Sequence, residues 1–257
     1  MDALLAIYQD PDFLPLALGT NLVSMGAFLA FSLPLTWVAA RDPAALRRFR
    51  IQRRPPKTEG LLRRSLVAFI GNDLALLAVT VLAFPVLRHS GIHGGPLPSV
   101  LEVLLQLVFF IYLDDFLYYW VHRAMHHGFL WKRVHVVHHR IHTPWAITGH
   151  LMHPVEFVVT AGLMLIGPLA LGSHYLTLYL WVVIRQWEAA EGHCGYDFPF
   201  SPTHLLPGCV GALHHDYHHA KVKGNYAGFL AYLDRLFGTT VRGYEEARAP
   251  RPHPEEA

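Results

Sequence analysis

The chain has 257 residues, of which 53% are apolar and only 16% are charged. This balance goes beyond that of ordinary globular domains and predicts a membrane-embedded protein, while a net charge of only +2 gives no reason to expect a nucleic-acid partner. The two cysteines exclude a disulfide framework and a cysteine-based zinc or iron–sulfur site.

Several apolar stretches have the length of a membrane span. We expect transmembrane helices at 14–40, 65–87 and 98–121, because about 20 apolar residues cross a bilayer as a helix. The apolar stretch from 155 to 183 is interrupted by GPLALGSH, which predicts a helical hairpin or a pair of spans. The expected fold is an all-α integral membrane protein with about four transmembrane helices.

The loop between the first two spans sets the expected orientation. Residues 41–64 carry nine Lys or Arg residues against two acids, so the positive-inside rule places them in the cytoplasm. Counting spans from there brings 122–153 and 193–219 to the same face. We therefore expect a cytoplasmic, histidine-rich helical cap.

Histidine is concentrated in this cap, because 16 of the 19 histidines lie between His122 and His219. Side chains at i, i+3 and i+4 share a helix face, so the second and third of three clusters are each expected to point three imidazoles in one direction. About eight imidazoles exceed what one ion accepts, which predicts a two-metal site. The clusters are His122, His126 and His127; His135, His138 and His139; and His215, His218 and His219.

Other classes of histidine-rich protein fit less well. A low-complexity storage loop does not repeat H-x-x-H-H twice in helical phase. A metal transporter is expected to carry ligands within its spans, whereas residues 155–190 supply only His174. A zinc protease would need an H-E-x-x-H helix, which the sequence lacks.

Further polar groups lie close to the clusters in sequence. Asp115, Tyr119, His122 and His126 follow spacings of four, three and four, so one face of the third span leads toward the metals. Asp115 is expected either to hydrogen-bond the second nitrogen of a ligand histidine or to lie at the membrane interface. His214 is expected to be an outer hydrogen-bond partner or an alternative ligand.

These clusters and their surroundings resemble the fatty acid hydroxylase and sterol desaturase superfamily of membrane di-iron oxygenases. The resemblance covers about residues 49–239 and is strongest to the C4-methylsterol monooxygenase branch. It is carried, in the same order, by FRIQRRPP, LDDFLYYWVHRAMHH, HVVHHRIHTPW, HPVE, IRQWEAAEGHCGYDFP, HHDYHH and GNYAGFLAYLDRLFGT.

The resemblance implies a ligand set in which the choice between His126 and His127 stays open. One departure from the family pattern is His150, where a residue other than histidine is expected. Minor ligands or groups that support the ligands are expected among His153, Glu156, Asp197 and Asn225, with helix capping or loop support as the alternative role. The implied ligands are His122, His126 or His127, His135, His138, His139, His193, His215, His218 and His219.

The resemblance also implies a reaction. The cofactor would be two iron ions, with zinc an alternative occupant of the purified protein, and O2 would be the co-substrate. The implied activity is hydroxylation or stepwise oxidation of a sterol or related lipid, as in a C4-methylsterol monooxygenase. The alternatives are a fatty acyl or carotenoid hydroxylase or desaturase and, in a different class, a membrane metal-binding or transport protein.

Partners and location follow from what the sequence lacks. Without a dinucleotide-binding glycine motif, a cysteine cluster or a haem segment, electrons are expected from an external NAD(P)H-dependent carrier, such as a ferredoxin or a cytochrome b5-type protein with its reductase. A lipid substrate is expected to enter from the bilayer beside Phe116, Tyr118, Tyr119 and Trp120.

Residues 1–246 are expected to form one catalytic domain and 247–257 a disordered tail. The missing lysine retrieval signal favours a bacterial inner membrane with the metal site cytoplasmic.

Overall fold

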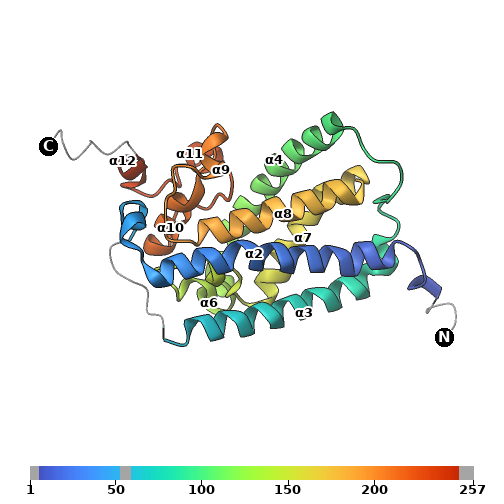
Figure 1. Ribbon diagram of the computed structural model, residues 1–257, viewed down its shortest axis with the longest axis horizontal. Coiled ribbons are helices and arrows are strands. Elements are labelled where there is room, and N and C mark those ends of the chain that lie inside the picture. The colour runs from blue at the N-terminus through green and yellow to red at the C-terminus, as the bar shows by residue number, and fades with distance from the viewer. Residues whose placement is uncertain (1–5, 53–58, 249–257) are drawn as a thin grey trace.

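The computed structural model describes residues 6–52 and 59–248, and within these ranges its regular elements are helices. The long helices run side by side as a bundle (Figure 1). They are η1 with α2 (Leu14–Gly19 and Thr20–Arg41), α3 (Leu61–Leu87), α4 (Val100–Met125), α7 (Pro154–Leu171) and α8 (Tyr175–Gly192).

Short helices gather at one end of this bundle and form the cap, with α6 and α10 at the left of Figure 1. Because many of them span only one or two turns, their positions depend on packing against the bundle rather than on helix propensity. They are η2 (Ala44–Phe49), α5 (Gly128–Leu130), η3 (Trp131–His135), α6 (Val136–His139), η4 (Ala146–His150), α9 (Pro202–Leu205), α10 (Gly211–Lys221), α11 (Tyr232–Leu236) and α12 (Tyr244–Arg248).

Three stretches are long and apolar enough to cross a membrane: Leu14–Arg41, Leu61–Leu87 and Pro154–Leu171. This confirms a multi-pass membrane protein at the level of length and composition. The expected third span corresponds to α4, which is not among these three stretches. Large apolar side chains nevertheless stay exposed along α4, including Val100 and Leu104. A count of about four spans and the cytoplasmic side of the cap stay predictions.

The interrupted stretch at 155–183 forms a pair of helices, α7 and α8. The turn is made by Gly172, whose φ of +55° is unfavourable for other residues and whose Cβ would lie 3.1 Å from the Gly91 carbonyl oxygen. His174 then caps α8, because its Nδ1 accepts a hydrogen bond from the Leu176 N–H at 2.9 Å.

The packing within the bundle positions the cap. Trp181 of α8 is fully buried and donates its indole N–H to the Met164 carbonyl of α7 at 2.9 Å. Gly167 of α7 lets Phe110 of α4 approach closely, since a Cβ there would lie 2.5 Å from the phenyl ring. At the C-terminus, Ala247 and Arg248, the first two residues of the expected tail, belong to α12. The rest of that tail, 249–257, lies outside the described residues.

Candidate metal centre

Two groups of histidines lie side by side in the cap, and within each group the candidate ligand atoms are within 4.8 Å of one another. We call them group A and group B. Nearly all of these side chains are buried. Group A is His122, His126, His135, His139 and His218; group B is His138, His193, His215 and His219.

Each of the second and third sequence clusters divides between the two groups, which corrects the expectation that each would point one way. His135 and His139 belong to group A, whereas His138 belongs to group B. In α10, conversely, His215 and His219 belong to group B and His218 belongs to group A. The reason is geometric: residues i and i+4 nearly eclipse on a helix, whereas i+3 and i+4 differ by about 100°. Each cluster therefore serves both groups and ties them together.

Backbone carbonyls fix the orientation of several rings. The Nδ1 atoms of His122 and His218 lie 2.8 and 2.7 Å from the Tyr226 and Gly224 carbonyl oxygens. In group B, His193 and His219 contact the Ala189 and Ile141 carbonyls at 2.7 and 2.9 Å. A carbonyl oxygen only accepts, so each Nδ1 must donate and each Nε2 is left with a free lone pair.

These lone pairs point at one another. The Nε2 atoms of His193 and His219 are 3.2 Å apart, and those of His193 and His138 are 3.1 Å apart. Two acceptors at this distance repel unless a cation lies between them. Ligand nitrogens about 2.1 Å from one ion are about 3.0–3.4 Å apart, which agrees with the observed spacing. The donor set therefore fits one metal ion per group.

Burial keeps the imidazoles neutral, which is their ligand form. Burial, and then the neighbouring His122 and His127, lower the pKa of His126 to about 2. Burial is likewise the main cause that lowers the pKa of His193 to about 4, against an opposing hydrogen bond to the Ala189 carbonyl. The same cause holds the pKa of His138, His215, His218 and His219 well below the usual value.

A carboxylate supports group A from the bundle. Glu156, in the first turn of α7, places Oε1 2.7 Å from Nδ1 of His135. This is the contact expected of a group that sets the orientation and tautomer of a ligand histidine. The geometry therefore agrees with a supporting role for Glu156 rather than a capping role.

The loop after α10 provides the carbonyls that hold His122 and His218. Asn225 lies between those two carbonyls in the left-handed region, with φ at +53°. Its side-chain amide donates to the His214 carbonyl at 3.0 Å, and its oxygen accepts from the Val241 N–H at 2.8 Å. Asn225 thus shapes the loop and does not belong to either histidine group.

Asp115 and Asp234 hold the same loop from two sides. Oδ1 of Asp115 accepts from the backbone N–H groups of Gly228, Phe229 and Leu230 at 2.7–3.2 Å. Asp115 therefore contacts the loop and not a ligand nitrogen, which corrects the first of its two expected roles. Asp234 accepts from the N–H groups of Tyr226 and Ala227, both at 2.9 Å. Asp234 could not be predicted from the sequence, because no local spacing links it to the histidines.

The remaining expected site residues lie outside both groups. His127 is exposed and directly precedes α5, whereas His126 lies in group A. His153 caps α7, and Asp197 contacts His204 on a partly exposed surface at 2.9 Å. His214 is buried with its Nε2 3.4 Å from Asp234 Oδ2, so it faces the loop rather than the metals.

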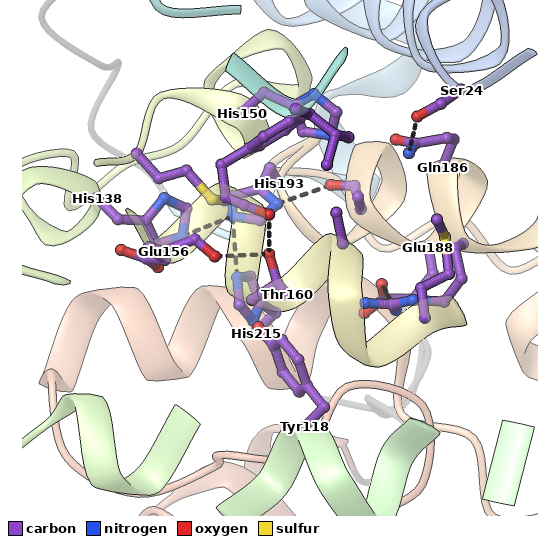
Figure 2. Close-up of a pocket in the computed structure, with 18 residues that line it drawn as sticks. Ser24, Tyr118, His138, His150, Glu156, Thr160, Gln186, Glu188, His193 and His215 are labelled. Atoms are coloured by element: carbon purple, nitrogen blue, oxygen red, sulfur yellow. Dashed lines mark hydrogen bonds and ion pairs between the residues drawn. The ribbon is translucent and has the colours of Figure 1, made fainter. Parts of the chain in front are cut away.

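A cavity of about 80 Å³ borders group B and is lined by His138, His193 and His215 (Figure 2). Glu156, which contacts group A, also lines it. Gln186 and Glu188 lie on the other side of it in Figure 2. Arg185 also lines the cavity and pairs with Asp114 at 3.2 Å.

His150, where the family pattern predicts a residue other than histidine, also lines this cavity. Its ring stacks on that of Phe28, with the ring centroids 3.6 Å apart. Of the aromatic residues expected beside the substrate, Tyr118 lines the cavity, whereas Phe116 and Trp120 are exposed and Tyr119 packs under the loop after α10.

Comparisons with known proteins agree with this geometry. The profile of the family described as fatty acid hydroxylase matches residues 107–239, which include both histidine groups. Methylsterol monooxygenase 2-2 of Arabidopsis thaliana is 34% identical over 242 residues, covering 92% of this chain and 90% of its own. A very-long-chain aldehyde decarbonylase of Oryza sativa subsp. indica is 41% identical over 177 residues, covering 67% of this chain and 66% of its own. No solved structure matches significantly.

Proposed function

Because the chain belongs to the fatty acid hydroxylase family, we propose that it is a di-iron, O2-dependent membrane monooxygenase that oxidises a sterol or related lipid, with a C4-methylsterol as the favoured substrate. The observation that carries this proposal is the cavity beside group B. It brings a partly apolar space into contact with the neutral, oriented imidazoles of group B, beside group A. Such an arrangement suits chemistry on a water-insoluble substrate.

Iron bound by groups A and B would supply the reduction of O2 and the oxidation of an unactivated C–H bond. Inserting one oxygen atom of O2 into a C–H bond consumes two electrons and two protons and releases one water molecule. The reaction therefore needs a reductant as well as a lipid and O2.

The chain's own residues position and protect this reaction. The carbonyls of Gly224 and Tyr226 and the carboxylate of Glu156 hold ligand rings in one orientation, which reduces the reorganisation that oxidation of the substrate would otherwise require. Phe157 and Met164 line the cavity with apolar surface that excludes water. Arg185, Gln186 and Glu188 provide polar groups for the polar end of a lipid.

The electrons are proposed to come from an external NAD(P)H-dependent carrier of the ferredoxin or cytochrome b5 type. A second substrate class is favoured by the aldehyde decarbonylase relatives, whose names refer to very-long-chain aldehydes. A fatty acyl substrate is therefore the alternative to a sterol. The relatives come from plants and Dictyostelium, so the comparisons give no support to a bacterial inner membrane.

The proposal is tested with purified protein in detergent, supplied with ferredoxin, ferredoxin reductase and NADPH. We expect about two iron ions per chain and, with a 4,4-dimethylsterol, formation of a 4-hydroxymethyl product that requires O2 and incorporates one 18O atom from 18O2. His218→Ala should lose both iron and product while remaining in the membrane fraction. A protein that binds a single zinc ion and forms no O2-dependent product with sterols or fatty acyl lipids would refute the proposal.

A further inference from the structure

Trp131 places an indole ring directly against group A. The ring stacks on that of His126, with the ring centroids 5.2 Å apart and the ring planes 21° apart. It also contacts the rings of His139 and His135, with centroids 5.4 and 6.1 Å away. All six tryptophans lie in the described parts of the chain, and among them Trp131 is the one whose ring contacts either histidine group.

A turn after α4 brings Trp131 to this position. Helix α4 ends at Met125, and Gly128 then lies in the left-handed region with φ at +54°, where the chain bends. The Trp131 N–H donates to the His127 carbonyl at 3.2 Å, and Trp131 begins η3. The side chain is half-buried. One indole ring therefore connects the ligand histidines of group A with the surface of the cap.

The proposed reaction draws two of its electrons from the lipid. Oxidation of a C–H bond to an alcohol uses O2, two protons and two electrons from the carrier, and the C–H bond supplies the other two electrons. Without a lipid in the cavity, complete reduction of O2 to two water molecules takes four electrons and four protons. The two missing electrons must then come from another donor, and the ligand histidines themselves are the nearest side chains.

Tyr226 is the other electron-rich ring beside several histidines of group A. Its centroid lies 5.0 Å from that of His126 and 5.8 Å from that of His218. A phenol gives up an electron readily only when its hydroxyl proton leaves at the same time, whereas an indole can give up an electron and keep its N–H proton. Tyr226 is also only 6% exposed, so an external reductant reaches the Trp131 ring more easily.

We propose that Trp131 is a redox-active residue that protects the metal centre when O2 is reduced without a lipid in the cavity. The indole gives one electron to the oxidised centre through the imidazole rings that it contacts, and becomes a radical. An external one-electron reductant, such as a reduced iron–sulfur carrier or ascorbate, then returns that electron. Two such cycles supply the two missing electrons, the accompanying protons come from water, and the indole is left unchanged. The inference rests on the proposed function.

A single reaction with O2 in the absence of lipid tests this role. Iron-loaded protein is reduced anaerobically with dithionite until both irons are ferrous, mixed with O2 and frozen for EPR spectroscopy. We expect an organic radical whose signal narrows when the tryptophans carry deuterated indole rings, and which Trp131→Phe lacks. Trp120→Phe is the matched control and should keep the signal, because Trp120 is 40% exposed but packs on Tyr119 and Phe237 rather than on a histidine.

A second measurement separates electron donation from simple shielding of group A by an aromatic ring. Wild type and Trp131→Phe should bind equal amounts of iron before the reaction. After repeated reduction and exposure to O2 without lipid, peptide mass spectrometry should find oxygen added to Trp131 in wild type, and to His126 or His139 in Trp131→Phe. Trp131→Tyr should protect the histidines again, because a phenol at this half-buried position can release its proton to water. Equal protection by phenylalanine would indicate shielding alone and overturn the inference.

The outcomes also separate this inference from the proposed function. A radical that persists in Trp131→Phe, on Tyr226 or Trp120, would overturn the role of Trp131, as would the absence of any radical in wild-type protein that oxidises lipid. A Trp131 radical in protein that oxidises no lipid would support the inference and refute the proposed lipid oxidation. Ferrous protein that O2 does not oxidise would refute both.

Discussion

At the scale of single residues, His126 and His127 are neighbours whose sequence context does not separate them. In the structure, His126 Nε2 lies 2.9 Å from His135 Nε2, whereas the His127 side chain is exposed. We therefore expect His126→Ala to lose iron from group A and His127→Ala to retain it. Metal analysis of the two purified variants by mass spectrometry measures this directly. Iron loss confined to His127→Ala would contradict the assignment.

Asp234 holds the loop after α10, whose carbonyls contact His122 and His218 of group A. Burial tends to raise the pKa of its carboxyl, but hydrogen bonds from His214, Thr239 and the Ala227 N–H lower the pKa below the usual value, so it stays ionised. Asp234→Asn would point an NH2 group at backbone donors and should lower the free energy of unfolding by about 2 kcal/mol. Denaturant unfolding of the iron-loaded protein measures this change. Asp197→Asn, at a carboxylate that is 33% exposed, should change it little.

The histidine clusters could be predicted because their spacing is local, whereas the roles of Asp115 and Asp234 could not. Asp115 binds N–H groups more than 110 residues later in the chain, at Gly228, Phe229 and Leu230. The sequence placed Asp115 correctly on the helix face that leads toward His122. The predicted hydrogen-bond partner of Asp115 was wrong, because the tertiary fold decides which loop contacts that helix face.

At the scale of elements, the lengths of the apolar stretches predicted the long helices well, whereas helical periodicity predicted the side-chain directions of the histidines less well. The apolar stretches correspond to α2, α3, α4 and the pair α7 and α8. The ends of the first three lie within a few residues of those expected, whereas α8 continues to Gly192, beyond the expected end at 183. The histidine triplets were expected to face one way, but a two-metal site uses the angle of about 100° between adjacent residues to divide them. That division could not be predicted, because the sequence does not show that one helix, such as α10, supplies ligands to both groups.

The contact between α4 and α7 depends on Gly167. Because a Cβ there would lie 2.5 Å from the Phe110 ring, we expect Gly167→Ala to lower the free energy of unfolding by about 1–3 kcal/mol. Phe110→Leu in the same chain should restore part of this loss. On the same helix, Gly162 has no atom within 4 Å of its would-be Cβ, so Gly162→Ala should be neutral or stabilising. Thermal unfolding in detergent compares the three variants, and equal effects of the two glycine substitutions would argue against this contact.

At the scale of the whole molecule, composition predicted a membrane protein, and the structure adds where the metal centre lies relative to the bundle. The ligand histidines come from the cap and from the adjoining ends of α4 and α8, while the apolar helices extend away from them. Hydropathy could predict the histidines on one membrane face, because each successive span moves the chain to the other side of the membrane. It could not reveal the cavity beside group B, which forms only when separate helices pack together.

The cap also has a basic surface beside the loop after α10. Lys221, Lys223 and Arg242 are exposed and surround a hollow of about 530 Å³. Its lining includes Gly224 and Tyr226, whose carbonyls accept from His218 and His122. A carrier bound here would therefore be separated from two ligand histidines by one peptide group and one hydrogen bond. Complementary charge would speed the encounter of an acidic carrier at low salt.

We therefore expect Lys221→Glu combined with Lys223→Glu to slow iron reduction by a reduced acidic ferredoxin about tenfold at low salt, with the difference shrinking as salt rises. Reduction by dithionite should be unchanged, because a small reductant needs no docking surface. Reversing Arg63 and Arg64, an equally charged exposed pair at the start of α3, is the control. Stopped-flow absorbance measures both rates. Slower ferredoxin-driven reduction in the Arg63 and Arg64 variant alone would move the docking surface to the loop between the first two spans.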